Sequence, residues 1–184
     1  MALSIGLILV VLAFLAAPGS YDGPSNSPYA QVLSNMKQLH LATQQMALDG
    51  VTAGDSNLGW PGDTGGSFSN WTTALVEKGY LGTNDLCKLL SAPGKVVRPG
   101  RIPTDMKDSA VLVYAVKKDF PTNAVFLTTA NFTYTPQGGV LDAKTRLFGN
   151  RIFVVFRKGG DGGLYLSKFV GDTNRIGSYV PLCR

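Results

Sequence analysis

The sequence predicts an α+β fold in which one long amphipathic helix and two shorter helices precede a small antiparallel sheet. Residues 29–50 carry apolar side chains with the period of a helix, and they form the longest run with one clear period. After residue 109 the period changes to short runs rich in Val, Phe, Tyr and Leu, each bounded by turn residues. The short connections between these runs favour antiparallel pairing, because parallel strands require a long crossover.

The long helix has one face suited to a protein core. Ser27 is a suitable N-cap, Pro28 fits the first helical position, and Gly50 is typical of a helix end. At about 100° per residue the apolar side chains fall within roughly 60° of one direction. We expect this stripe to cover the sheet, and its main residues are Val32, Met36, Leu39 and Met46, with Thr43 and Ala47 beside them.

A second, weaker apolar strip lies on the opposite side of the same helix. Leu41 and Leu48 fall roughly 160–180° from the main face. Two interpretations remain open: the strip contacts something outside the head, or a loop of the same chain covers it.

Residues 3–17 form an uncharged apolar run, and residues 2–17 as a helix would span about 24 Å. A cleaved signal peptide usually has a basic segment ahead of the apolar run, and a buried core helix usually has one polar side. Neither pattern is present, so a membrane anchor fits best. The anchor side chains are Leu3, Ile5, Leu7, Ile8, Leu9, Val10, Val11, Leu12, Phe14 and Leu15.

The chain is expected to have three parts: an anchor helix (1–17), a Pro/Gly-rich tether (18–28) and a globular α+β head (29–184). Within the head, residues 70–78 predict a helix capped by Ser69, and residues 84–90 predict a helix capped by Thr83. Four strands are predicted, and the glycine-rich segment KGGDGG predicts a tight hairpin between the last two. The strand runs are 110–117, 124–132, 151–157 and 164–170.

Composition and charge limit the function classes. The net charge is +5, but the basic residues are scattered and do not alternate with aromatic residues, so a nucleic-acid partner is not expected. Cys87 and Cys183 lack the spacing of a metal site. They form either one disulfide, if the chain is exported, or two buried thiols.

Catalytic, cofactor and metal sites are not expected. The single histidine, His40, lies at the edge of the buried stripe, where a packing or hydrogen-bonding role is the simpler interpretation. Asp55 and Asp63 lie in a turn-rich loop that lacks the spacing of a calcium loop. The GGDGG segment lacks the lysine and the following helix of a phosphate-binding loop. A small-molecule substrate is therefore not expected.

Several segments in this order resemble type IV pilins and the pseudopilins of type II secretion, and most closely the pseudopilin-like proteins of the Verrucomicrobia–Planctomycetes kind. An apolar N-terminal run precedes SNMKQLHLATQQMALDG (34–50), then GWPGD (59–63) and the helix of residues 70–81. LCKLLSAPG (86–94) and FVVFRKGGDGG (153–163) are also similar. Prepilins carry a basic leader, whereas the first basic residue of this sequence is Lys37. After Gly6, the only plausible cleavage position, the fifth residue is Val11 instead of glutamate.

The resemblance implies a non-enzymatic structural subunit of a type II secretion or type IV pilus-like assembly. Its partners would be the membrane and other pilin-like subunits, in a homo- or hetero-oligomer. The expected location is the inner membrane, crossed once, with the head in the periplasm or on the cell surface. Some members of the family bind calcium in a C-terminal loop, but only Asp161 and Asp172 lie near it here, which does not support a calcium site.

The alternative function is an exported surface-binding module on a membrane anchor. Its partner would be a glycan or a protein, held by Trp60, Trp71 and other loop aromatics. This function requires aromatic side chains that are exposed as a platform.

Overall fold

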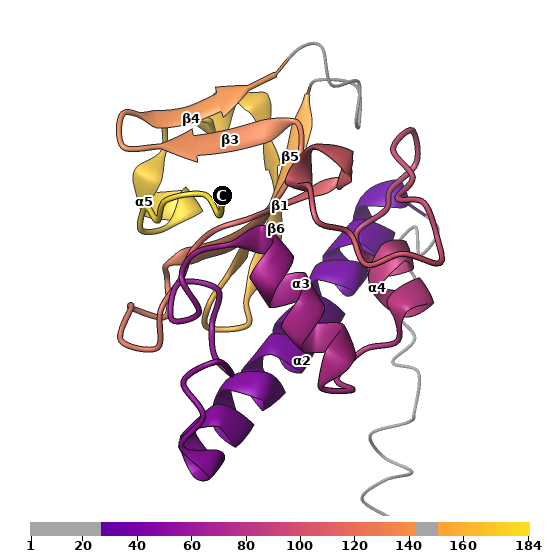
Figure 1. Cartoon of the computed structure of the whole chain (residues 1–184). Coiled ribbons are helices and arrows are strands. Elements are labelled where there is room, and N and C mark those ends of the chain that lie inside the picture. Colours follow the sequence, from indigo (N-terminus) through magenta and orange to yellow (C-terminus); the bar gives the residue numbers. More distant parts are fainter. Residues whose placement is uncertain (1–26, 143–150) are drawn as a thin grey trace, which may run out of the picture.

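The computed structural model describes residues 27–142 and 151–184 and shows an α+β fold (Figure 1). One long helix and two shorter helices lie on one side of a four-stranded antiparallel sheet, and a two-stranded hairpin lies on the other side. The helices are α2 (Pro28–Ala53), α3 (Phe68–Glu77), α4 (Thr83–Leu89) and α5 (Thr173–Ile176). Short 3₁₀ turns are η1 (Met106–Asp108) and η3 (Ser167–Phe169). The strands are β1 (Val111–Val113), β2 (Val125–Thr129), β3 (Phe132–Thr135), β4 (Gly138–Leu141), β5 (Ile152–Arg157) and β6 (Gly162–Leu166).

Helix α2 begins as predicted but ends one turn later. The Ser27 side chain accepts a hydrogen bond from the Tyr29 amide at 3.2 Å. The helix ends at Gly54, which has the left-handed conformation, so the predicted end at Gly50 is wrong. Gly50 is instead buried, and a Cβ there would lie 2.1 Å from the Leu58 carbonyl oxygen. The glycine is needed because the returning chain crosses close to the helix.

The inner face of α2 lies in the core. Its main contacts are with β5, β6, α3 and α4. The Thr43 hydroxyl donates to the Leu39 carbonyl at 2.8 Å and accepts from the Trp71 indole N–H at 3.1 Å, which ties α2 to α3. The predicted apolar residues of this face are all buried: Val32, Met36, Leu39 and Met46.

Both short helices begin at other residues than predicted. Helix α3 starts at Phe68, because the Ser67 side chain, not that of Ser69, accepts from the Asn70 amide at 3.3 Å. Helix α4 includes Thr83 as its first residue, and its N-cap is Gly82, which makes no side-chain cap bond. These shifts of one or two residues reflect competition between neighbouring Ser, Thr and Gly residues for the cap position.

The four-stranded sheet has the order β1-β2-β5-β6, and all its neighbouring strands are antiparallel, as predicted. The last strand lies earlier than the predicted run 164–170: β6 begins at Gly162, and η3 follows it at once. A Cβ at Gly162 would lie 2.6 Å from the Leu33 side chain, so this glycine permits α2 to approach the sheet closely.

A second hairpin, β3–β4, was not predicted. The run 124–132 is not one strand, because β2 ends at Thr129 and Phe132 begins β3. At the break, the Asn131 side chain donates to the Ile152 carbonyl at 2.9 Å. Phe132 then stacks on Phe153 with ring centroids 4.0 Å apart, so the hairpin covers the face of β5 that points away from α2.

The predicted anchor (1–17) and residues 18–26 of the tether lie outside the described residues. In the part of the chain that the structure describes, no helix combines the length and the apolarity needed to cross a membrane.

Candidate functional site: the groove beside Trp60 and the outer face of the long helix

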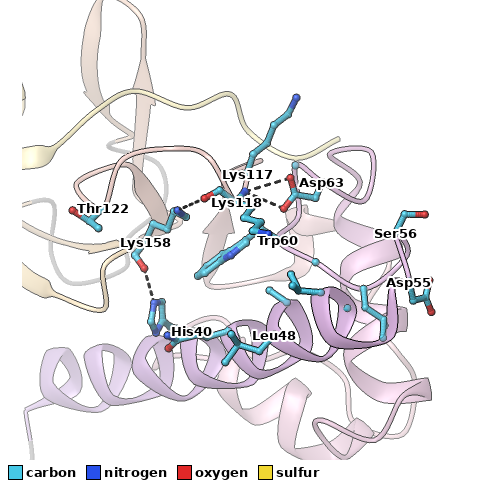
Figure 2. A pocket seen from close by; sticks show the side chains of 18 of the residues that line it. His40, Leu48, Asp55, Ser56, Trp60, Asp63, Lys117, Lys118, Thr122 and Lys158 are labelled. Carbon is cyan, nitrogen blue, oxygen red and sulfur yellow. Dashed lines mark hydrogen bonds between the residues drawn. The ribbon is translucent and has the colours of Figure 1, made fainter.

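A groove of about 900 Å³ runs along the C-terminal half of α2 (Figure 2). The helix forms one side of the groove. The other side is formed by the loop that follows α2, the loop at residues 117–122 and the β5–β6 turn. Trp60 lies between these sides, with His40 and Lys158 at one end and Asp55 and Ser56 at the other.

Backbone contacts hold the loops around the groove in place. The chain turns at Trp60 and Pro61, and the Gly62 amide donates to the Val116 carbonyl at 2.8 Å. The Asp63 carboxylate accepts from the Lys118 amide at 3.0 and 3.3 Å. Two loops that are distant in sequence are thereby joined over Trp60, which is consistent with a groove that is formed before any ligand arrives.

His40 is a buried hydrogen-bond donor at one end of the groove. Its Nε2–H donates to the Lys158 carbonyl at 2.7 Å, and its ring lies 5.4 Å from Phe156 and 5.6 Å from Trp60, centroid to centroid. Burial lowers its pKa below the usual value of 6.5, although the Lys158 carbonyl and the charge of Asp161 oppose this shift. The imidazole therefore helps to join α2 to the β5–β6 turn as a neutral group.

The amine of Lys158 is also held by internal contacts. Its Nζ donates to the Lys118 carbonyl at 2.8 Å and to the Phe120 carbonyl at 2.7 Å, and it lies 5.7 Å from the centre of the Trp60 ring. The polar groups at this end of the groove thus bind one another.

The outer face of α2 borders the groove and is open. Leu41, Leu48 and Val51 are 53%, 56% and 57% exposed, and the last two also line the groove. Among the residues that the structure describes, no loop covers this strip, and both interpretations that the sequence left open stay predictions. Lys37 is the one charged residue of α2 whose side chain is largely exposed. Lys37 lies on the same side as Leu41, so this face carries one charge beside three large exposed apolar side chains.

The cysteines and the tryptophans are buried. Cys87 and Cys183 are free thiols in this structure, so the bridge between them that the sequence left open is not formed in it. Burial raises the pKa of both thiols, that of Cys183 to about 12. Trp60 and Trp71 are also buried, so neither indole offers the exposed platform that the alternative function requires.

The carboxylates considered for calcium have other partners. Asp55 accepts from the Asn57 amide at 2.9 Å, and Asp63 accepts from Lys118. Asp161 pairs with Arg157, and Asp172 pairs with Arg175 at 3.0 Å. Among the described residues, no three His, Cys, Asp or Glu side chains come together in a way that could hold a metal ion.

Some features of this surface were not found from the sequence. Val51 extends the exposed strip because α2 continues past Gly50, where the sequence predicted its end. The role of Lys158 depends on carbonyls 38 and 40 residues away, and nothing local indicates it. The glycines beside Lys158 were the one available signal, since they predict the turn that brings this residue back to α2.

No family model matches this chain, and no curated protein or solved structure matches it either.

Proposed function

We propose that this chain is a non-enzymatic, membrane-anchored structural subunit of the pseudopilin-like kind, in a type II secretion or type IV pilus-like assembly. A long helix packed on a small antiparallel sheet is the head that the sequence resemblance implies. The apolar run at residues 3–17 would anchor the chain in the inner membrane with a single span. The head would then lie in the periplasm or on the cell surface.

The observation that carries this proposal is the open strip on α2. Leu41, Leu48 and Val51 are each more than half exposed. Apolar area removed from water stabilises an interface by about 25 cal/mol per Å². A neighbouring pilin-like subunit that packs along α2 would bury this strip without desolvating a row of charges.

The polar groups of the groove support a structural role over a catalytic one. His40 and Lys158, two of the titratable groups of the groove, are hydrogen-bonded to backbone carbonyls, and the Asp63 carboxylate accepts from the Lys118 amide. Their contacts join α2 to the sheet and to the loop at residues 117–122. They therefore stiffen the surface next to the exposed strip.

The anchor is tested by deletion of residues 2–17. We expect the full chain to sediment with membranes and the shortened chain to stay in the supernatant with an unchanged far-UV circular dichroism spectrum of its head. Membrane association that persists in the shortened, folded chain would contradict the anchor.

The subunit contact is tested by cross-linking the full chain in membranes through an introduced thiol. We expect Leu48→Cys to give a disulfide-linked dimer on mild oxidation, because the strip faces a neighbouring subunit. Val140→Cys on β4 is the matched control, since Val140 is also 56% exposed. Equal cross-linking at both positions would indicate random collision and would refute the contact.

The groove also favours a second candidate, a surface module that binds a protein or a glycan. Because Trp60 and Trp71 are buried, contact would be made mainly by Leu48, Val51 and the loop backbone. Quenching of tryptophan fluorescence by acrylamide tests the aromatic platform itself: strong quenching of the free head would indicate an indole available for binding, and weak quenching would leave only contact through Leu48, Val51 and the loop backbone.

A further inference from the structure

The segment between α4 and β1 carries more basic than acidic side chains, and we call it the basic loop (residues 91–108). It encloses a cavity of about 670 Å³. Four cationic side chains line this cavity against two carboxylates, which leaves an excess of positive charge. The cations are Lys95, Arg98, Arg101 and Lys107, and the carboxylates are Asp105 and Asp108.

The backbone of the basic loop is fixed although the loop has little regular structure. Lys95 and Ala92 exchange two backbone hydrogen bonds of 2.9 Å. The buried Cys87 thiol lies 3.4 Å from both the Arg98 and the Arg101 carbonyl oxygens. The buried Thr72 hydroxyl donates to the Pro103 carbonyl at 2.7 Å. The backbone that carries both arginines is therefore held in place before any anion binds, so binding has to order only their side chains.

The charges of the loop are not neutralised by ion pairs. The salt bridges among the described residues are Lys88–Asp85, Arg157–Asp161 and Arg175–Asp172, and none includes a cation of the loop. Burial lowers the pKa of Lys95, while Asp105 and Asp108 act in the opposite direction. Arginine side chains are planar and bind phosphate oxygens in pairs. The cavity therefore offers phosphate groups two guanidinium groups and a partly buried amine.

The loop lies beside the end of α2 at which residues 1–26 join the head. Asn35 on α2 donates to the Lys88 carbonyl on α4 at 3.4 Å. A further cavity of about 640 Å³ is lined by Gln31 on α2 and by Val96 and Pro99 of the loop. Figure 1 shows the loop next to the first turns of α2. Val96 is 77% exposed at this end of the head.

We propose that the basic loop binds the phosphate headgroups of anionic phospholipids at the surface of the membrane that holds the anchor. This inference rests on the proposed function, because the apolar run at residues 3–17 must bring the head to the membrane. Residues 18–27 can span at most about 36 Å, so the loop stays within reach of the headgroups. Basic residues are drawn to anionic lipid, and an exposed Val96 suits the boundary between headgroups and acyl chains.

The test places a fluorophore on the thiol of Val96→Cys in the full chain, since Cys87 and Cys183 are buried. The chain is reconstituted in vesicles of phosphatidylcholine, with or without about one third phosphatidylglycerol, that contain a lipid with a nitroxide on its headgroup. We expect quenching to be at least about threefold stronger with phosphatidylglycerol and to be lost in about 1 M salt. A fluorophore on Val140→Cys should show no such difference.

Two triple variants distinguish the effect of the basic loop from the effect of the net charge of the chain. Lys95→Gln, Arg98→Gln and Arg101→Gln together should abolish the effect of phosphatidylglycerol. Lys78→Gln, Arg151→Gln and Lys168→Gln remove the same charge from exposed positions elsewhere and should retain it. Equal quenching in both vesicle types, or an effect that survives in the loop variant, would overturn the proposal.

The remaining outcomes separate this inference from the anchor. A chain that enters both vesicle types but shows no response at residue 96 retains the anchor and overturns only the lipid contact. A chain that enters neither type overturns the anchor and the inference together. If inorganic phosphate changes the emission of the fluorophore at residue 96 without vesicles, and phosphatidylglycerol vesicles add no quenching by the nitroxide lipid, the loop binds small anions and the lipid proposal is overturned.

Discussion

The two faces of α2 carry similar side chains but have opposite surroundings. Leu39 on the inner face is 0% exposed, whereas Leu41, only two residues later, is 53% exposed. The same residue type thus stabilises the head on one side and remains open to a partner on the other. The comparison shows that apolar character alone does not separate a core face from an interaction face.

The largest difference is expected from truncating a leucine on each face. Leu39→Ala should lower the free energy of unfolding by about 2–5 kcal/mol, because it leaves a cavity among well-packed neighbours. Leu41→Ala should change it by less than about 0.5 kcal/mol. Urea unfolding followed by circular dichroism measures both values, and similar losses in the two variants would contradict the distinction between the faces.

A smaller effect is expected from the polar contact within the inner face. Thr43→Val keeps the shape of the side chain but leaves the Trp71 indole N–H buried without its acceptor. The free energy of unfolding should fall by about 1–3 kcal/mol. Thr43→Ser keeps the hydroxyl and serves as the control in the same urea experiment. A valine variant as stable as the serine variant would show that this hydrogen bond contributes little.

At the border between the faces, His40 should make stability depend on pH. Its pKa is lowered in the folded state, so below about pH 6.5 the unfolded chain takes up a proton that folded His40 does not. The contribution of His40 to the free energy of unfolding is fully present above that pH. It falls as the pH drops, by at most about 1.4 kcal/mol per pH unit. His40→Gln retains an N–H donor for Lys158 and does not titrate. Urea midpoints at pH 8 and pH 5 should therefore differ less in the variant than in the natural chain.

The smallest effect on folding is expected on the outer face beside the groove. Leu48→Gln should change the free energy of unfolding by less than about 0.5 kcal/mol, because this side chain is already largely in water. The same substitution should weaken cross-linking through Leu41→Cys in membranes. A large loss of stability would mean that the strip belongs to the core, and unchanged cross-linking would separate it from subunit contact.

Much of the head follows from local patterns in the sequence. The stripe of α2, the start of that helix at Ser27 and Pro28, and the four antiparallel strands are all expected from periodicity and cap residues. The break between β2 and β3 was missed because the residues next to Asn131 include neither Gly nor Pro, although Pro136 and Gly138 at the β3–β4 turn are turn signals. The chain turns at Asn131 because its side chain bonds to β5, a contact that no local pattern shows.

The two candidate surfaces, the strip on α2 and the basic loop, also follow partly from local sequence patterns and partly from tertiary contacts. The sequence shows that Leu41 and Leu48 are apolar and share one side of a helix, because helical geometry places residues seven apart on nearly the same line. The sequence also shows the basic residues of the basic loop. It does not show that they line one cavity, because the course of the loop depends on its hydrogen bonds to Cys87 and Thr72.

By itself, the sequence determined the periods, the caps and the α+β order of the head, because these depend on interactions between residues that are close along the chain. Only the tertiary structure decided that Gly50 lies inside α2 under the Leu58 carbonyl, that Trp60 is buried beside a groove and that the described part of the chain leaves the strip on α2 exposed. Each of these depends on which distant segment packs there, and packing is settled by the whole chain at once.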